Sequence, residues 1–237
     1  MYYYGFDWTY LVLVLPCVLL SLWASSNVNS TFNKYSKQYS QRRITGADAA
    51  RRVLAANGVH NVRIERVSGN LTDHFDPKTN VIRLSDSVFD ATSTAAIGVA
   101  SHEAGHAVQY AENYAPMRVR AAIIPLTNFG SKLAMPLIII GLLLSFAEGF
   151  SYFFVYLGIA CFGLSLLFQL VTLPVEFNAS RRAMAAIESA GLLSPDEQKG
   201  AKKTLKAAAL TYVAATATAL AQVLRLILLY GRRSRRN

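Results

Sequence analysis

The segment His102-Glu103-Ala104-Gly105-His106 contains the residues of this sequence that are best suited to metal chemistry. In a helix, side chains four positions apart lie on one face, so both imidazoles can bind one ion at a Zn–N distance of about 2.1 Å. The Glu103 carboxylate directly follows the first histidine, where it can accept a proton from a water activated by zinc. Two of the chain's four histidines fall in this pattern. We therefore interpret the segment as a zinc site.

Two simpler interpretations of the same segment are possible. The histidines could be hydrogen-bonded to backbone or acidic groups, or they could belong to a purely structural zinc site. Structural sites normally have four protein ligands and favour cysteine. Cys17 and Cys161 both lie in apolar runs and are expected to be unpaired core thiols. The sequence thus favours a catalytic ion that has three protein ligands and one water.

A third protein ligand has to come from elsewhere in the chain. The candidates are His60, His74 and Glu176. Glu176 directly follows the longest apolar run. If the two runs before it form a hairpin, the chain returns at Glu176 to the side on which the zinc segment lies. The alternative for Glu176 is an interfacial charge that pairs with Arg181 or Arg182.

Further residues are candidates for substrate binding. A donor should stabilise the oxyanion of the reaction, and His74 or Asn178 could supply it. The residues around His74 are also typical of a turn with acidic caps. The short strand expected at Val81–Ser85, with Ile82 and Arg83, could pair with an extended peptide substrate. Its alternative is an internal strand of a hairpin.

The composition indicates a multi-pass membrane protein. Of the 237 residues, 53% are hydrophobic and only 16% are charged, and the mean hydropathy is +0.28. Soluble domains carry about a quarter charged residues. Low charge and two cysteines also exclude a disordered chain and a disulfide scaffold. The net charge of +10 is interpreted first as membrane topology, because lysine and arginine gather on the cytoplasmic side, and no nucleic-acid-binding motif accompanies it.

Four apolar runs surround one polar region. They are Trp8–Ala24, Leu133–Ala147, Gly149–Val175 and Ala207–Leu229. The first is expected to be a retained anchor, because no basic residue precedes it as in a signal peptide. The second and third should form a hairpin with a tight turn at Glu148 and Gly149. The fourth contains Arg225 and either spans the membrane or packs near its surface.

The polar region alternates short helices and strands. We expect a helix at Ala49–Ala56, preceded by Thr45-Gly46-Ala47-Asp48 and ended by a cap at Asn57-Gly58. Strands are expected at Val62–Val67 and Val81–Leu84, and a long helix from Thr94 to Glu112. The predicted parts are an N-terminal transmembrane anchor (1–26), a zincin-like domain (27–120), a transmembrane helical hairpin (121–175), a third-ligand helix with a basic helix (176–206), and a C-terminal apolar helix with a basic tail (207–237). The expected fold class is therefore mainly α, a membrane helical bundle with a small α+β zincin-like catalytic domain at the membrane surface.

Several segments together resemble the YugP-type family of bacterial membrane zinc metallopeptidases. These segments are Asp73–Pro77, Val81–Ser85, His102–His106 and Leu173–Ser180, and the resemblance covers most of the chain. It implies zinc peptidase chemistry with His102, His106 and Glu176 as ligands and Glu103 as the general base. A looser similarity connects the chain to membrane CAAX-prenyl and heat-shock zinc proteases, whose third ligand lies in a Glu-x-x-Ala-Asp segment. Ser180 stands at that Asp position, where it can orient a histidine ligand only more weakly.

The expected function is an integral-membrane zinc endopeptidase with one Zn²⁺ per chain, acting on peptides or membrane proteins at the bilayer. The alternative is a non-catalytic zinc-binding scaffold that binds proteins or anionic lipids. A purely structural site has no need of an acid beside its ligand, which favours the enzyme. The resemblance implies a bacterial plasma membrane, and we expect the active site on its cytoplasmic side. If all four runs span, however, the basic clusters 181–206 and 232–236 lie on opposite faces.

Overall fold

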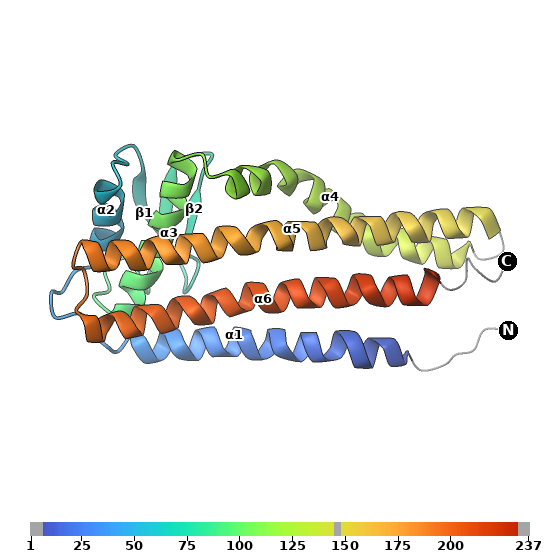
Figure 1. Ribbon diagram of the computed structural model, residues 1–237, viewed down its shortest axis with the longest axis horizontal. Coiled ribbons are helices and arrows are strands. Elements are labelled where there is room, and N and C mark those ends of the chain that lie inside the picture. The colour runs from blue at the N-terminus through green and yellow to red at the C-terminus, as the bar shows by residue number, and fades with distance from the viewer. Residues whose placement is uncertain (1–6, 145–147, 232–237) are drawn as a thin grey trace. The chain divides into compact units, whose positions relative to one another are not determined.

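The computed structural model describes residues 7–144 and 148–231, and it is mainly helical with one small sheet, as expected (Figure 1). A π-helical turn at Tyr10–Val14 leads into the first long helix. The elements are α1 (Leu15–Tyr35), α2 (Gly46–Ala56), β1 (Arg63–Val67), β2 (His74–Asp76), β3 (Val81–Ser85), α3 (Thr94–Ala111), α4 (Ala115–Leu143), α5 (Glu148–Ser189) and α6 (Pro195–Gly231).

Within the described ranges, four helices are long and apolar enough to cross a membrane. They are Tyr10–Tyr35, Ala115–Leu143, Tyr152–Ser189 and Pro195–Tyr230. Each contains or overlaps one of the four apolar runs, so the ambiguous fourth run has the length and composition of a span. The structure differs from expectation at the ends of the runs, because α5 and α6 continue unbroken through 175/176 and 206/207. Pro174 lies inside α5 without ending it.

Two expected features fall partly or wholly outside the described residues. Glu148 and Gly149 belong to α5 instead of forming the expected turn, and residues 145–147 before them are not described. The basic tail at 232–236 is likewise outside the described part of the chain.

The chain divides into two compact units. One, called here the helical unit, comprises residues 1–23, 119–172 and 212–237, and the other, called the mixed unit, comprises residues 24–118 and 173–211. The mixed unit therefore combines the polar region with the end of α5 and the start of α6, two segments far away in the sequence. All the residues expected to do chemistry belong to it.

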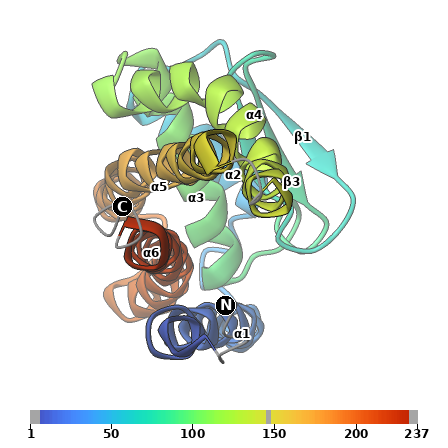
Figure 2. The same ribbon diagram turned by 90° about the vertical axis from the view of Figure 1, so that its right-hand side faces the viewer.

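The helical unit uses small residues and hydrogen-bonding hydroxyls where its helices meet. A Cβ at Gly158 of α5 would lie 2.6 Å from Ile138 Cγ1 and 2.9 Å from the Ala134 carbonyl oxygen on α4, so only glycine permits this approach. Figures 1 and 2 both show α1 beside α6, where Thr218 Oγ1 lies 3.1 Å from Ser21 Oγ. Such contacts hold apolar helices together where the hydrophobic effect contributes little.

Arg225, the charge that made the fourth run ambiguous, is paired within the helical unit. Its Nε donates to Asp7 Oδ2 at 2.9 Å, and a second guanidinium nitrogen contacts the same oxygen. The guanidinium also lies 5.4 Å from the centre of the Tyr10 ring. The arginine is therefore compensated by a carboxylate and an aromatic face at the start of the first long helix.

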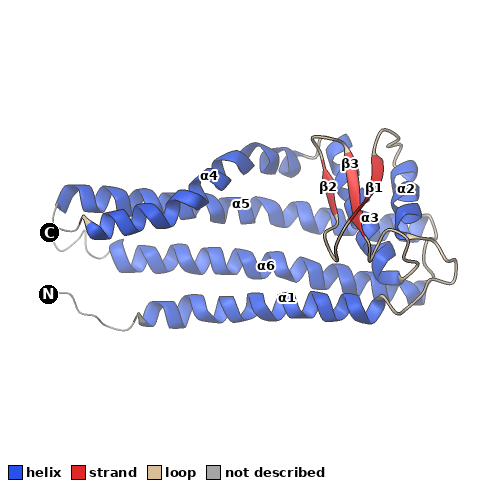
Figure 3. Cartoon of the chain, turned by 180° about the vertical axis from the view of Figure 1, so that it is seen from behind, coloured by secondary structure: helices blue, strands red, loops and turns tan. Residues whose placement is uncertain are grey.

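The sheet of the mixed unit has the order β1-β3-β2, with β1 parallel and β2 antiparallel to β3. Figure 3 shows the three strands beside α2 and α3. Their apolar side chains share a core with both helices; its members include Val53, Ile82, Leu84 and Ile97. Helix α2 begins at Gly46, before the expected Ala49, because Thr45 caps it: its Oγ1 accepts the Asp48 N–H at 3.1 Å.

The expectation that Val81–Ser85 pairs with substrate is wrong. This segment is the central strand β3, with Ile82 paired to Ile64 on one side and to Phe75 on the other. Ile82 is fully buried, and Arg83 makes ion pairs with neighbouring carboxylates of the sheet. Because β3 has no free edge over Val81–Arg83, neither Ile82 nor Arg83 can offer its backbone to a peptide. The alternative of an internal strand is correct.

Candidate metal centre

Helix α3 positions both histidines. It begins after Ser93, whose Oγ accepts the Ala96 N–H at 3.2 Å, and it ends one residue before the predicted Glu112. His102 and His106 lie on one face of this helix, with ring centres 4.6 Å apart. Most of α3 is buried, so the rings are held by a rigid element inside the mixed unit.

A close helix crossing brings the third donor to the histidines. A Cβ at Gly105 would lie only 2.8 Å from the Ala179 carbonyl oxygen on α5. The absence of a side chain at Gly105 therefore lets the backbones of α3 and α5 approach, as only glycine allows. Glu176 lies nearly one turn before Ala179 on α5. The crossing thus sets Glu176 opposite the histidine face of α3.

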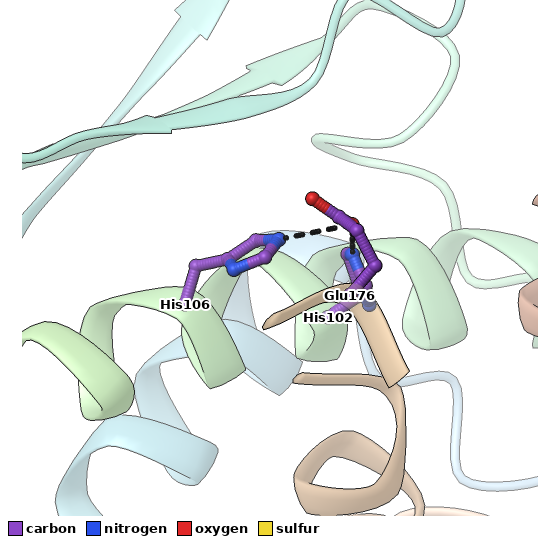
Figure 4. A group of neighbouring side chains, drawn as sticks. All are labelled: His102, His106 and Glu176. Carbon is purple, nitrogen blue, oxygen red and sulfur yellow. Dashed lines mark hydrogen bonds and ion pairs between the residues drawn. The ribbon is translucent and has the colours of Figure 1, made fainter. Parts of the chain in front are cut away.

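The three side chains converge, as Figure 4 shows. Glu176 Oε2 lies 3.2 Å from His102 Nε2 and 3.5 Å from His106 Nε2. One ligand atom from each residue lies within 4.8 Å of the others, so the group could hold one metal ion. Glu176 is only 2% exposed and His106 8%. Two imidazoles and a carboxylate are a donor set that suits zinc and leaves a coordination position for water.

The electrostatics of the cluster favour a positive charge at its centre. Burial by itself lowers the pKa of His106, but the hydrogen bond and the negative charge of Glu176 raise it overall. A buried carboxylate facing two imidazoles needs a cation to compensate it, either a proton or a metal ion. Both the types of donor atom and the buried negative charge therefore favour a cation at this place.

A second set of hydrogen bonds orients the two histidine rings. Ser180 Oγ lies 3.2 Å from His102 Nδ1, so Ser180 reaches the ring it was expected to orient. His106 Nδ1 lies 3.0 Å from the amide oxygen of Gln109. Because an amide oxygen only accepts, Nδ1 of His106 carries the hydrogen and Nε2 is left free to bind a metal.

Gln109 is the site residue that sequence reasoning missed. It is fully buried, and its Nε2 donates to Val175 O and Asn178 Oδ1, both at 2.9 Å. It therefore connects the His106 ring to α5 on the same stretch that carries Glu176. The available signal was a polar side chain one turn after His106 on a helix whose face is otherwise small and apolar.

Asn178, predicted as a second-shell or substrate-binding residue, belongs to this network. Its Oδ1 accepts from Gln109 and also from Arg182 Nε at 2.8 Å. Arg182 in turn pairs with Glu112 Oε2 at 2.7 Å, just beyond the end of α3. The structure thus places Asn178 behind His106, where it supports the glutamine. The oxyanion role for Asn178 stays a prediction.

Glu103 lies among buried groups next to His102. Glu103 is only 8% exposed. The pKa of nearby Asp73 is raised, mainly because the carboxyl group is buried. Hydrogen bonds from the Ser85 N–H and hydroxyl lower this pKa, whereas the negative charge of Glu103 raises it further. The two Ser85 bonds measure 2.8 and 2.9 Å. The Glu103 carboxylate therefore shares its surroundings with a second, hydrogen-bonded acid.

The other two histidines lie outside the cluster. His74 is exposed on β2, with Nδ1 2.9 Å from Thr72 O, and His60 is exposed in a loop. Asp76 caps the turn expected after β2, where its Oδ1 accepts the Lys78 N–H at 2.9 Å. Hydrogen bonds to its carboxylate, the strongest from the Thr79 hydroxyl, lower the pKa of Asp76 to about 2. In the described part of the chain, no second group of three metal-ligating side chains converges in this way.

Replacing Gly105 by alanine should weaken metal binding at least about tenfold, because the added Cβ must push Ala179 and with it Glu176 away. The measurement is a chelator competition with detergent-purified protein. Gly163→Ala is the matched control, since a Cβ there has nothing within 4 Å and the helix only gains propensity. Wild-type affinity in the Gly105→Ala variant would contradict the close crossing.

Comparisons with known proteins show the family to which the chain belongs. The family profile described as "Putative neutral zinc metallopeptidase" matches residues 10–231. The chain is also 45% identical over 221 residues to the "Putative membrane protease YugP" of Bacillus subtilis (strain 168), a match that covers 93% of this chain and 96% of that relative. No solved structure matches the chain significantly. The chain therefore belongs to the family described as "Putative neutral zinc metallopeptidase".

Proposed function

We propose that this protein is an integral-membrane zinc endopeptidase that hydrolyses peptide bonds in proteins at or near the bilayer. The observation that carries the proposal is the convergence of His102, His106 and Glu176 beside the buried acid Glu103. Membership of a zinc metallopeptidase family supports the chemistry. Four helices with the length and composition of membrane spans, and a relative named as a membrane protease, support the location.

In the proposed site, Nε2 of both histidines and Oε2 of Glu176 hold one Zn²⁺, and the fourth position is left for water. When bound there, zinc supplies Lewis-acid chemistry: it polarises the substrate carbonyl and lowers the pKa of water to about 7. Glu176 reaches the site from α5, so the site is complete only when α3 and α5 are packed together. Gln109 holds the His106 ring in the tautomer that leaves Nε2 for the ion, and Ser180 contacts Nδ1 of His102 and helps to orient that ring.

Glu103 is the proposed general base. Its carboxylate takes a proton from the attacking water and returns it to the leaving amine, as a buried acid beside the metal can do. His74 remains the proposed donor to the oxyanion. Its Nδ1 bonds the Thr72 carbonyl, and Phe75 next to it contacts Tyr110 of α3 at a ring distance of 5.8 Å.

Glutamine substitutions separate metal binding from catalysis. We expect wild type and Glu103→Gln to contain about one zinc per chain and Glu176→Gln to lose it, because an amide is a poor replacement for the carboxylate ligand. Glu103→Gln should lower cleavage of a membrane-protein substrate by about 10²–10⁴-fold. Metal content by atomic emission and cleavage in detergent are the measurements, with His74→Ala measured in the same series.

Glu188→Gln is the matched control, since Glu188 is an exposed acid further along the same helix. It should retain both zinc and activity. Full zinc content in Glu176→Gln would remove Glu176 from the ligand set. Unchanged cleavage in Glu103→Gln would remove the proposed base, whereas zinc binding without any cleavage in wild type would favour the non-catalytic scaffold.

Gln109→Met tests the orienting hydrogen bonds. The substitution keeps the volume of the side chain but removes its bonds to His106, Val175 and Asn178. We expect zinc affinity to fall about 10–100-fold, which is the usual cost of losing a partner of a metal-bound histidine. Chelator competition measures the affinity, and Gln41→Met, at an exposed position, is the control. Equal affinities for the two variants would contradict the orienting role.

We propose further that the mixed unit faces the cytoplasm. Basic residues gather in it at the ends of three candidate spans or just beyond them, at 34–43, 181–182 and 199–206. With four crossings, the tail at 232–236 then lies on the opposite side and departs from the charge bias. A membrane-impermeant maleimide added to intact cells should therefore label Arg236→Cys but not Lys78→Cys. Labelling of Lys78→Cys alone would reverse the orientation.

A further inference from the structure

The mixed unit has a hollow where α1 faces α6, away from the candidate metal centre. Its volume is about 350 Å³. The walls come from one face of each helix, because positions 27, 31, 34 and 35 of α1 and positions 203, 206, 207 and 210 of α6 repeat at the three- and four-residue spacing of a helix face. The polar lining residues of α1 are Asn27, Thr31, Lys34 and Tyr35, and α6 adds Lys203 and Lys206. The hollow is thus built by two helices, and no loop takes part.

The lining carries three positive charges and no acid. Lys34, Lys203 and Lys206 are its charged residues, and all three are exposed. Within the described residues, none of them forms an ion pair with a carboxylate, whereas Lys199 on the same helix pairs with Asp196 at 2.7 Å. Lys34 contacts only an aromatic face, with Nζ 5.7 Å from the centre of the Tyr35 ring. Three ammonium groups without a counter-ion around one hollow attract an anion with several oxygens.

The polarity of the hollow changes along its length. The lysines lie toward the end of α1 and the start of α6, whereas Ala207 and Leu210 lie further along α6, in the direction of its apolar segment. Asn27 is likewise the lining residue of α1 nearest to its apolar segment. An amphiphile whose charged headgroup meets the lysines and whose chains follow the apolar helices matches this gradient.

We propose that the hollow between α1 and α6 binds a phosphate-bearing anion through Lys34, Lys203 and Lys206. The ligand chemistry is a net-negative phosphate group, contributed either by a membrane lipid headgroup or by free phosphate. The uncharged donors Thr31 and Tyr35 line the same hollow close to Lys34 and can complete the hydrogen bonds of its oxygens. The site is independent of the zinc chemistry, since it shares no residue with the metal centre.

The test uses native mass spectrometry of the full chain in detergent, with titration of three probes. These are dioleoylphosphatidylglycerol, dioleoylglycerol, which has the same chains without phosphate, and inorganic phosphate. The pocket variant combines Lys34→Gln, Lys203→Gln and Lys206→Gln. The matched control combines Lys37→Gln, Lys78→Gln and Lys202→Gln, which removes the same charge at exposed positions outside the lining.

We expect the pocket variant to bind phosphatidylglycerol on the order of a hundredfold more weakly than wild type, and the control variant to bind it like wild type. Dioleoylglycerol should show no difference between the variants. Should inorganic phosphate alone bind with the same dependence on the three lysines and displace the lipid, the phosphate site holds and its source is free phosphate.

Equal lipid and phosphate binding by the pocket and control variants overturns the proposal, because the effect would then be one of net charge. The single variants Lys203→Gln and Lys206→Gln keep the test valid if the triple variant does not fold. Each should weaken binding about fivefold while Lys202→Gln does not. Wild-type affinity in both single variants also overturns the proposal.

Discussion

The close crossing of α3 and α5 at Gly105 is the constraint on which the candidate site depends. Two histidines on one helix cannot make a three-ligand site, and the third donor belongs to a segment 70 residues further along the chain. A Cβ added at Gly105 would lie only 2.8 Å from the Ala179 carbonyl oxygen, which shows how little space separates the helices. With any larger residue, Glu176 would move away from the imidazoles. A residue without a side chain therefore determines where the candidate metal ligands meet.

The same crossing explains the buried polar network beside it. Once the backbones are this close, Gln109 can bond the ring of His106 and reach Val175 and Asn178 on the facing helix. Each bond satisfies a polar group that would otherwise be costly to bury. The network thus couples the orientation of the ring to the packing of α3 against α5. A metal site supported in this way is rigid, and rigidity is what a catalytic geometry needs.

Charge is distributed differently in the two units. The apolar helices of the helical unit contain few charges, and Arg225 is compensated by Asp7 and Tyr10. In the mixed unit, the buried acids Glu103 and Glu176 belong to the candidate metal centre, whereas the lysines that line the hollow between α1 and α6 have no carboxylate partner among the described residues. The candidate metal centre therefore suits a cation, and the proposed site between α1 and α6 suits an anion. Both lie next to helices with the composition of membrane spans, which is consistent with a protein whose ligands and substrates meet it at a bilayer.

Local patterns were enough to predict much of this protein. Hydropathy indicated the apolar runs, helical spacing placed His102 and His106 on one face, and the helix at Ala49–Ala56 and the strand at Val81–Ser85 followed from short-range patterns. Tertiary structure decided what depends on distant partners: that β3 is paired on both sides, that Gln109 orients His106, and that Glu176 lies against both histidines. No period or motif encodes which of two strand edges will be covered, or how near two helices will pack. Both outcomes depend on the shapes and volumes of side chains that are distant in the sequence, as at Gly105, and these side chains meet only in the folded chain.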